Sequence, residues 1–129
     1  MTEQEIVQQS LIAMIESPIY DETIIAKYFS ASYVQDVDGK TLYYPTFCKH
    51  IKTLKEITDK RKLTINHIIS QDNLVFTNHT VEIINKENKY SKIKVIAMFK
   101  IENHKIIYCD ELTFLMEGNE ENKNIGSIS

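Results

Sequence analysis

The sequence predicts one α+β domain, in which three helices and a hairpin are followed by a long antiparallel meander. Apolar residues in the first half of the chain recur at helical spacing, whereas from Leu63 onward they alternate with a period of two. The resulting strand-like segments are joined by connectors of only a few residues, which favour antiparallel pairing. A chain of 129 residues is long enough for a single domain with one core.

The first helix is predicted to begin after Thr2, because Thr2 and Glu5 have the spacing of a capping box. The pair Ser17-Pro18 ends its apolar pattern. A second, short helix follows, and Asp21 is placed to cap its first turn. We therefore expect two helices before the first strand.

A hairpin is predicted around Asp38-Gly39, since this pair lies between short β-branched and aromatic runs. A third helix is expected to begin near Pro45, with Leu54 on its inner face. The opposite face of this helix carries Lys49, Lys52 and Lys55. We interpret this stripe as solvated surface and not as a nucleic-acid patch, because no aromatic residues are interleaved with the lysines.

Four long strands are predicted at residues 63–70, 74–84, 91–101 and 105–116. They are apolar on both faces, and three helices can cover only one face of the sheet that they form. We therefore expect a homodimer in which the outer faces of two sheets pack together. The domain would span residues 1–118, and the polar segment 119–129 would be a tail.

Composition argues against several classes of function. The net charge of −3 gives no general attraction to nucleic acid or to an anionic membrane. No segment approaches the roughly 20 apolar residues that cross a bilayer, and the first residues do not resemble a signal peptide, so we expect a cytoplasmic protein. Cys48 and Cys109 are expected to be buried free thiols. No two histidines have metal-ligand spacing, so neither a metal nor another cofactor is expected.

The order of these elements resembles the nuclear transport factor 2-like superfamily, and the chain is most similar to its SnoaL-like branch. The similarity spans roughly residues 3–118 and includes FSASYVQDVDG at 29–39 and KIIYCDELTFLMEG at 105–118. The resemblance implies a strongly curved sheet wrapped around the helices as a cone, with a hydrophobic pocket inside its wide end. It also implies relatives of several kinds: ketosteroid isomerase, polyketide cyclases, dehydratases and hydrolases, but also binding and dimerisation modules without catalysis.

The resemblance points to three candidate catalytic residues. Asp36 matches the general base of ketosteroid isomerase, but Ser10 and Ala97 occupy the positions of the two oxyanion-hole donors of that enzyme. Steroid isomerisation is therefore not expected. Glu111 resembles the acid/base carboxylate on the final strand of polyketide cyclases, and His79, on an earlier strand, is the candidate histidine.

The same resemblance places Ala97 toward the cavity, and period-two alternation then predicts the other inner side chains. Glu111 and His79 would face inward, whereas Asp110 would face outward. The expected pocket-lining residues are Tyr33, Thr77, Val95, Ala97, Phe99, Cys109 and Thr113.

Two kinds of function remain open. The first is a small enzyme that applies acid–base chemistry to a small hydrophobic molecule, as an isomerase, cyclase or dehydratase does. The second is a non-catalytic module that binds a ligand or only dimerises. Glu111 would then be a structural carboxylate and His79 a neutral core histidine. Two titratable groups with opposed pKa shifts in one cavity would favour the enzyme.

Overall fold

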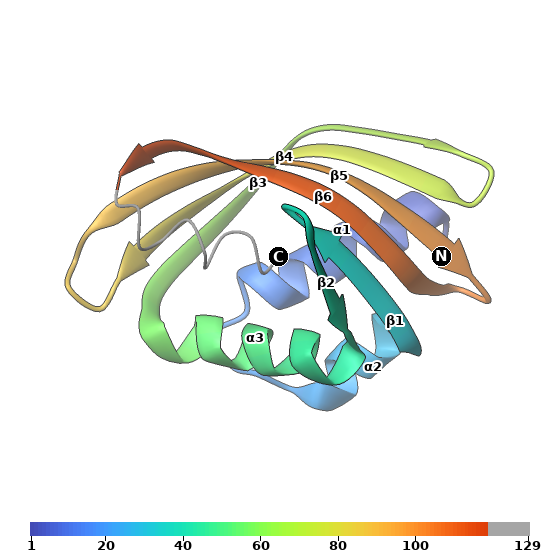
Figure 1. Cartoon of the computed structure of the whole chain (residues 1–129), viewed down its shortest axis with the longest axis horizontal. Helices are drawn as coiled ribbons and strands as arrows, with labels where there is room; N and C mark the ends of the chain where they lie inside the picture. The colour runs from blue at the N-terminus through green and yellow to red at the C-terminus, as the bar shows by residue number, and fades with distance from the viewer. Residues whose placement is uncertain (119–129) are drawn as a thin grey trace.

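The computed structural model describes residues 1–118, in which three helices pack against one face of a curved six-stranded sheet (Figure 1). The helices are α1 (Glu3–Ile15), α2 (Glu22–Tyr28) and α3 (Tyr44–Ile57). The predicted α+β architecture is confirmed. The tail expected at 119–129 lies outside the described residues. No helix within residues 1–118 is long and apolar enough to cross a membrane.

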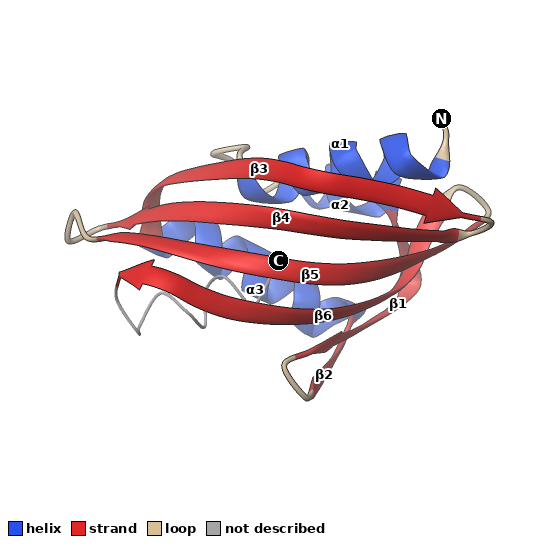
Figure 2. Cartoon of the chain, turned by 90° about the horizontal axis from the view of Figure 1, so that it is seen from above, coloured by secondary structure: helices blue, strands red, loops and turns tan. Residues whose placement is uncertain are grey.

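The sheet contains β1 (Phe29–Val37), β2 (Lys40–Tyr43), β3 (Thr58–Gln71), β4 (Leu74–Asn85), β5 (Tyr90–Glu102) and β6 (Lys105–Gly118). Their order across the sheet is β2-β1-β6-β5-β4-β3. Figure 2 shows the four long strands side by side, with the helices behind them. All neighbours are antiparallel except β1 and β6, which run parallel. This parallel pair joins the first hairpin to the end of the meander.

The helices begin where the sequence predicts. The Thr2 hydroxyl accepts a hydrogen bond from the Glu5 backbone N–H at 3.2 Å, and the Thr2 N–H donates to Glu5 Oε1 at 3.0 Å, which completes the capping box. Asp21 caps α2 by accepting from the Thr23 N–H at 2.9 Å. Pro45 lies in the first turn of α3.

The third strand begins at Thr58, earlier than the predicted start at Leu63. The intervening segment is rich in charge, but its residues still pair with β4: Lys60 lies opposite Ile84, and Lys62 lies opposite Glu82. β3 is an edge strand, where charged side chains are tolerated because they reach water. The charged residues thus concealed the start of a strand that pairs with β4 along its length, apart from two register shifts.

The end of α1 is stabilised by cations from other elements. α1 has no basic residue in its last turn, but Lys55 Nζ of α3 donates to the carbonyls of Ala13 at 2.9 Å and Ile19 at 3.1 Å. Arg61 Nε donates to the Ile15 carbonyl at 2.8 Å. The prediction that Lys55 belongs to a solvated stripe is therefore wrong. Burial lowers the pKa of Lys55 to about 8.

The core fills the space between the helices and the concave face of the sheet. Phe29, Tyr33 and Phe47 form an aromatic cluster there, with ring centroids 4.7–4.9 Å apart. The face of α3 that points to this cluster carries Phe47, Cys48, Ile51 and Leu54, all buried. α3 is thereby fixed against β1, which carries Phe29 and Tyr33.

Replacing Leu54 by alanine tests this packing. Leu54 is only 1% exposed, so Leu54→Ala should lower the free energy of unfolding by roughly 2–4 kcal/mol through lost burial and a residual cavity. Lys52→Ala, at an exposed position of the same helix, should change it by no more than about 0.5 kcal/mol. Urea unfolding measures both values. Equal effects would show that α3 is rotated about its axis relative to this description.

Candidate functional site

Glu111 is a buried carboxylate in the middle of β6. Its side chain is 1% exposed and lies on the concave face, next to Ala97 of β5. Glu111 Oε1 accepts a hydrogen bond of 2.5 Å from Gln35 Nε2, and Gln35 Oε1 accepts one of 3.0 Å from the Tyr33 hydroxyl. Within residues 1–118, Glu111 Oε2 is buried and has no hydrogen-bond partner. One oxygen of this carboxyl group is therefore held by a hydrogen bond, and the other is buried without one in the described part of the chain.

The surroundings of Glu111 favour its protonated form. Burial raises the pKa of Glu111 well above its usual range, and the negative charge of Asp38 acts in the same direction. The hydrogen bond from Gln35 acts in the opposite direction, because an N–H donor stabilises the ionised carboxylate. The cost of removing the charge from water dominates. The group is thus suited to donating a hydrogen bond or a proton.

His79 is a buried histidine on the concave face of β4. Its side chain is fully buried, and Nδ1 lies 2.9 Å from the Thr77 hydroxyl. In the described part of the chain, His79 Nε2 is a second buried atom without a partner. Burial lowers the pKa of His79 to about 4, so the imidazole is neutral at neutral pH. His79 therefore provides one fixed and one unsatisfied nitrogen.

Glu111 and His79 share one face of the sheet with β5 between them. Ala97 lies opposite Glu111, and Val95 lies opposite His79, so the two side chains occupy neighbouring rows of the sheet diagonally. Among residues 1–118 no hydrogen bond joins the two groups. The other predicted lining residues lie on this same face: Tyr33, Thr77, Val95, Ala97, Phe99 and Cys109 are buried and Thr113 is partly buried.

Asp36 lies on the opposite face of the sheet from Glu111. Its two oxygens accept hydrogen bonds from the hydroxyls of Thr41 at 2.6 Å and Tyr108 at 2.5 Å. These bonds lower the pKa of Asp36 because they stabilise the carboxylate. Asp110, its neighbour across β1 and β6, is exposed on this outer face. The structure therefore brings Glu111 and His79 to one face and separates Asp36 from both.

Comparison with known proteins identifies one relative in sequence and several structures with a similar fold. No family model matches the chain. Over 101 residues it is 31% identical to uncharacterized protein C11D3.04c of Schizosaccharomyces pombe, and the alignment covers 78% of each protein. A protein from Shewanella denitrificans, described as a SnoaL-like polyketide cyclase, matches with a TM-score of 0.75 and 12% identity, over 98% of this chain and 96% of that one. A nuclear transport factor 2-like protein of unknown function from Cytophaga hutchinsonii matches with a TM-score of 0.63 and 13% identity, over 87% and 96%.

The chain has the nuclear transport factor 2-like fold. The predicted resemblance is thereby confirmed at the level of the fold. Structural neighbours at such low identity show the fold alone, and this fold carries unrelated activities. The function of this chain must therefore be argued from its own site.

Gln35 and Asp38 are two residues of the site that sequence reasoning missed. Gln35 is buried because alternation along β1 turns it inward and its neighbour Asp36 outward. The Asp38 backbone N–H donates to the Glu111 carbonyl at 3.1 Å, and its carboxylate accepts from the N–H of Thr113 at 2.8 Å. The sequence did contain a signal for Gln35, because it is a polar residue at a position of β1 that alternation turns inward. The contact of Asp38 depends on strand order, which the sequence does not show.

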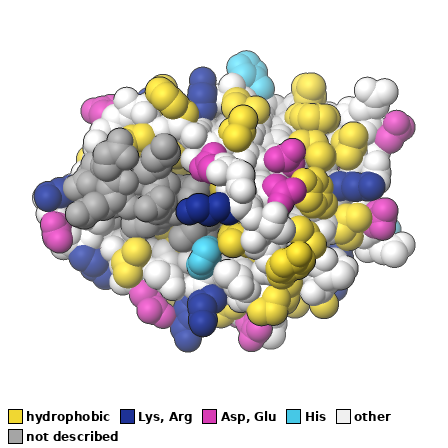
Figure 3. All heavy atoms as spheres, viewed as in Figure 1, with side chains coloured by type: hydrophobic (Ala, Val, Ile, Leu, Met, Phe, Trp, Pro, Cys, Tyr) yellow, Lys and Arg dark blue, Asp and Glu magenta, His cyan; other side chains and the backbone are white. Residues whose placement is uncertain are grey.

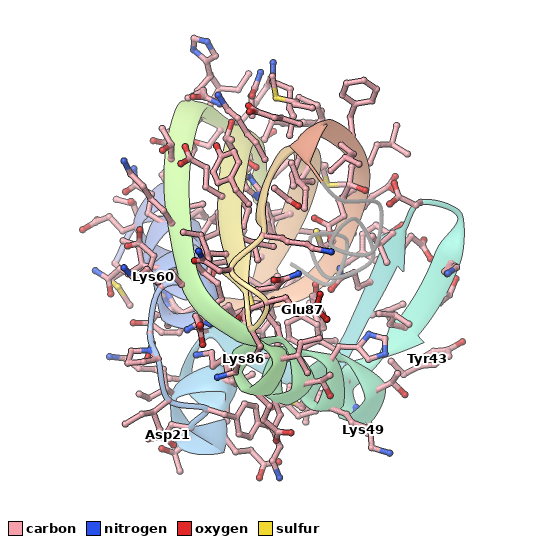
Figure 4. The ribbon with its side chains drawn as sticks, turned by 90° about the vertical axis from the view of Figure 1, so that its left-hand side faces the viewer. Asp21, Tyr43, Lys49, Lys60, Lys86 and Glu87 are labelled. Carbon is pink, nitrogen blue, oxygen red and sulfur yellow. The ribbon has the colours of Figure 1, made fainter. Side chains whose placement is uncertain are left out.

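Two surface hollows lie away from Glu111 and His79. One of about 460 Å³ lies beside the connection from α1 to α2 and includes Arg61 and Tyr90. Lys60 borders it and projects outward in Figure 4. The other, of about 450 Å³, lies beside α2. Within residues 1–118 no group of three or more His, Cys, Asp or Glu side chains could hold a metal. Cys48 and Cys109 are free and buried, as predicted.

The pH dependence of stability tests the state of Glu111. A carboxyl whose pKa is raised by folding stabilises the protein fully below its unfolded pKa of about 4.5, and this stabilisation is lost as the pH rises through the folded pKa. Glu111→Gln keeps the shape and cannot ionise. The variant should therefore gain stability over the natural protein as the pH rises, by about 1.4 kcal/mol for each pH unit between the two pKa values.

Thermal unfolding measured across this pH range gives the difference. Glu102→Gln removes a carboxylate at an exposed position of β5 and serves as the matched control, with a difference that should stay small at every pH. A gap between Glu111→Gln and the natural protein that is constant with pH would mean that folding does not perturb the Glu111 carboxyl.

Proposed function

We propose that the protein binds a small, uncharged and mostly apolar molecule on the concave face of its sheet, with Glu111 as the main polar contact. The observation that carries this proposal is the buried Oε2 atom of Glu111, which has no partner within residues 1–118. A buried polar atom without a hydrogen bond costs about 1–3 kcal/mol, so a ligand that supplies the missing bond recovers that free energy. His79 Nε2 offers a second such contact.

The residues around Glu111 support a ligand without charge. Val95, Ala97 and Phe99 present apolar surface on β5 beside it. The buried residues of the described chain include no lysine or arginine, so an anion would find no opposite charge there. Burial also favours the neutral form of the Glu111 carboxyl group, so a cation would find little negative charge to pair with. Shape and hydrogen bonding would therefore select the ligand.

A second candidate function is acid–base catalysis of the isomerase, cyclase or dehydratase type. The pKa shifts of Glu111 and His79 are opposed, which favours an acid and a base that are both neutral before reaction. Glu111 would give a proton to the ligand, and His79 would take one from it. A histidine with a pKa of about 4 is a weak base, so we place binding before catalysis. A module that only dimerises would leave both unsatisfied atoms without a role.

Binding of 2-acetylnaphthalene, a neutral aromatic ketone, tests the proposal against 2-naphthoate, an anion of similar size. The natural protein should bind the ketone and not the anion. Glu111→Met should weaken ketone binding by about tenfold, since one hydrogen bond contributes about 1 kcal/mol or somewhat more. Asp110→Asn removes the neighbouring carboxylate on the outer face and should leave binding unchanged. NMR titration measures the affinities.

Equal affinity of the natural protein for ketone and anion would contradict an uncharged site. Unchanged ketone affinity in Glu111→Met would remove Glu111 from it. No binding of either compound would contradict the proposal for ligands of this size.

We also propose that two copies form a homodimer through the outer face of the sheet. This face carries large apolar side chains that none of the helices within residues 1–118 covers, with exposures of 43% for Phe76, 50% for Ile96, 65% for Leu112 and 67% for Phe114. Phe76 lies opposite Met98, and Ile96 lies opposite Leu112, so the side chains form one continuous patch. A patch of this kind marks an interface more often than a free surface.

Charge on the outer face favours a second copy of the chain as the partner. Lys94 lies at one end of the patch opposite Phe114, and Asp110 lies at the other end opposite Met98. A two-fold axis across the strands reverses this order and brings Asp110 of one copy near Lys94 of the other. Figure 3 shows a side of the molecule other than this outer face, and basic side chains are scattered there without forming a continuous patch.

Light scattering tests the dimer. The natural protein should give twice the chain mass of 15.0 kDa at micromolar concentration. Leu112→Lys should produce the monomer, because an ammonium group would lose its hydration in the interface. Ile19→Lys, at a site that is 72% exposed outside the sheet, is the control and should leave the dimer intact. A natural protein that is monomeric and stays in solution would contradict the proposed interface.

A further inference from the structure

We infer that Gln35, held by Tyr33, fixes the acidic proton of Glu111 on Oε2, so that the site presents an O–H donor and takes a ligand with an acceptor oxygen. A ketone, an aldehyde or an ether has such an oxygen. This inference rests on the proposed binding function and specifies the class of ligand. Gln35 acts through Glu111, so it is a positioning residue.

The direction of two hydrogen bonds determines where the proton lies. The Tyr33 hydroxyl donates to Gln35 Oε1 at 3.0 Å, and Gln35 Nε2 donates to Glu111 Oε1 at 2.5 Å. A protonated carboxyl group has one O–H oxygen and one carbonyl oxygen. Oε1 of Glu111 already accepts an N–H, and a carbonyl oxygen accepts a hydrogen bond more strongly than the O–H oxygen of an acid does, so Oε1 is favoured as the carbonyl oxygen. The proton therefore belongs on Oε2, the buried oxygen without a partner in residues 1–118.

The orientation of the Gln35 amide follows from the packing of Tyr33. Tyr33 is 2% exposed, and its ring packs edge-on against Phe29 at 4.8 Å and in a tilted arrangement against Phe47 at 4.7 Å. Its hydroxyl meets the carbonyl end of the Gln35 amide, which turns the amide nitrogen toward Glu111. The parallel pairing of β1 with β6 brings Gln35 close to Glu111, because Val37, two residues beyond Gln35, lies beside Glu111.

Several titratable groups lie near Glu111, but within residues 1–118 none of them makes the hydrogen bond to its carboxyl group that Gln35 makes. The Asp38 carboxylate, from the turn between β1 and β2, is hydrogen-bonded to Thr113 of β6. Asp110 is exposed on the outer face, and His79 faces the interior from β4 across β5. Cys109 is buried, and burial raises the pKa of its thiol, so it stays protonated. Among the described groups, Gln35 is the one that donates a hydrogen bond to the Glu111 carboxyl.

A carboxyl titration in the ligand-free protein tests the arrangement. Carbon-13 NMR of protein labelled in glutamate gives the midpoint for Glu111, and the spectrum of Glu111→Gln assigns the signal. If the Gln35 N–H stabilises the ionised carboxylate, Gln35→Met should raise the midpoint by about one pH unit. Tyr33→Phe should raise it less, because the freed amide can still donate its N–H to the carboxylate in part of the molecules. Tyr33→Phe also keeps the test available if Gln35→Met fails to fold.

The opposite amide orientation predicts the opposite sign. If the Gln35 carbonyl accepted from the Glu111 O–H, both variants would lower the midpoint, and that result would overturn the inference. An unchanged midpoint in both variants would also overturn it. Tyr108→Phe removes a hydroxyl that binds Asp36 on the outer face, so it is the matched control and should leave the Glu111 midpoint unchanged.

The ligand class is tested separately with 2-acetylnaphthalene and 2-isopropenylnaphthalene, which has a CH₂ group in place of the carbonyl oxygen. The ketone should bind about tenfold more tightly, the effect of one hydrogen bond. Equal affinities would overturn the requirement for an acceptor oxygen and leave the proposed binding function intact. Failure of both probes, with the expected shifts in the titration, would contradict the proposed function while the proton assignment stands.

Discussion

The parallel pairing of β1 with β6 is the constraint on which the rest of the site depends. Within residues 1–118 it is the one parallel contact in a sheet that is otherwise antiparallel, and it joins a hairpin near the start of the chain to the last described strand. Through this contact Gln35 reaches Glu111, and Asp38 binds the backbone carbonyl of Glu111 and the backbone N–H of Thr113. The helices then close over the same face and remove the carboxyl from water.

A carboxyl group placed in this way weakens the protein more than an apolar residue would, because its burial is not offset by a full set of hydrogen bonds. Glu111 has one satisfied and one unsatisfied oxygen, and His79 repeats the pattern with its two nitrogens. Two half-satisfied groups on one concave face are easier to understand as contacts for a ligand than as devices for stability. The apolar side chains between them would supply the remaining binding energy.

Most of the fold could be predicted from the sequence, because local signals and periodicity specify it: the capping box at Thr2, the turn at Asp38-Gly39 and alternation in the long strands. The residues of the candidate site were harder to predict from the sequence. Family resemblance selected Asp36, while alternation along β1 turns that residue outward and its neighbour Gln35 inward. Lys55 was misjudged for a similar reason, since its partners are carbonyls 36 and 42 residues away. Contacts between distant segments decide such cases, and one sequence does not contain them.

The central claim is that Glu111 is a neutral acid with its proton on Oε2, directed away from Gln35. Neutron diffraction from a crystal of the ligand-free protein at neutral pD would observe that proton directly as deuterium. We expect deuterium on Glu111 Oε2 and an N–D bond of Gln35 that points to Glu111 Oε1. A Glu111 carboxylate without deuterium, or with deuterium on Oε1, would contradict the account.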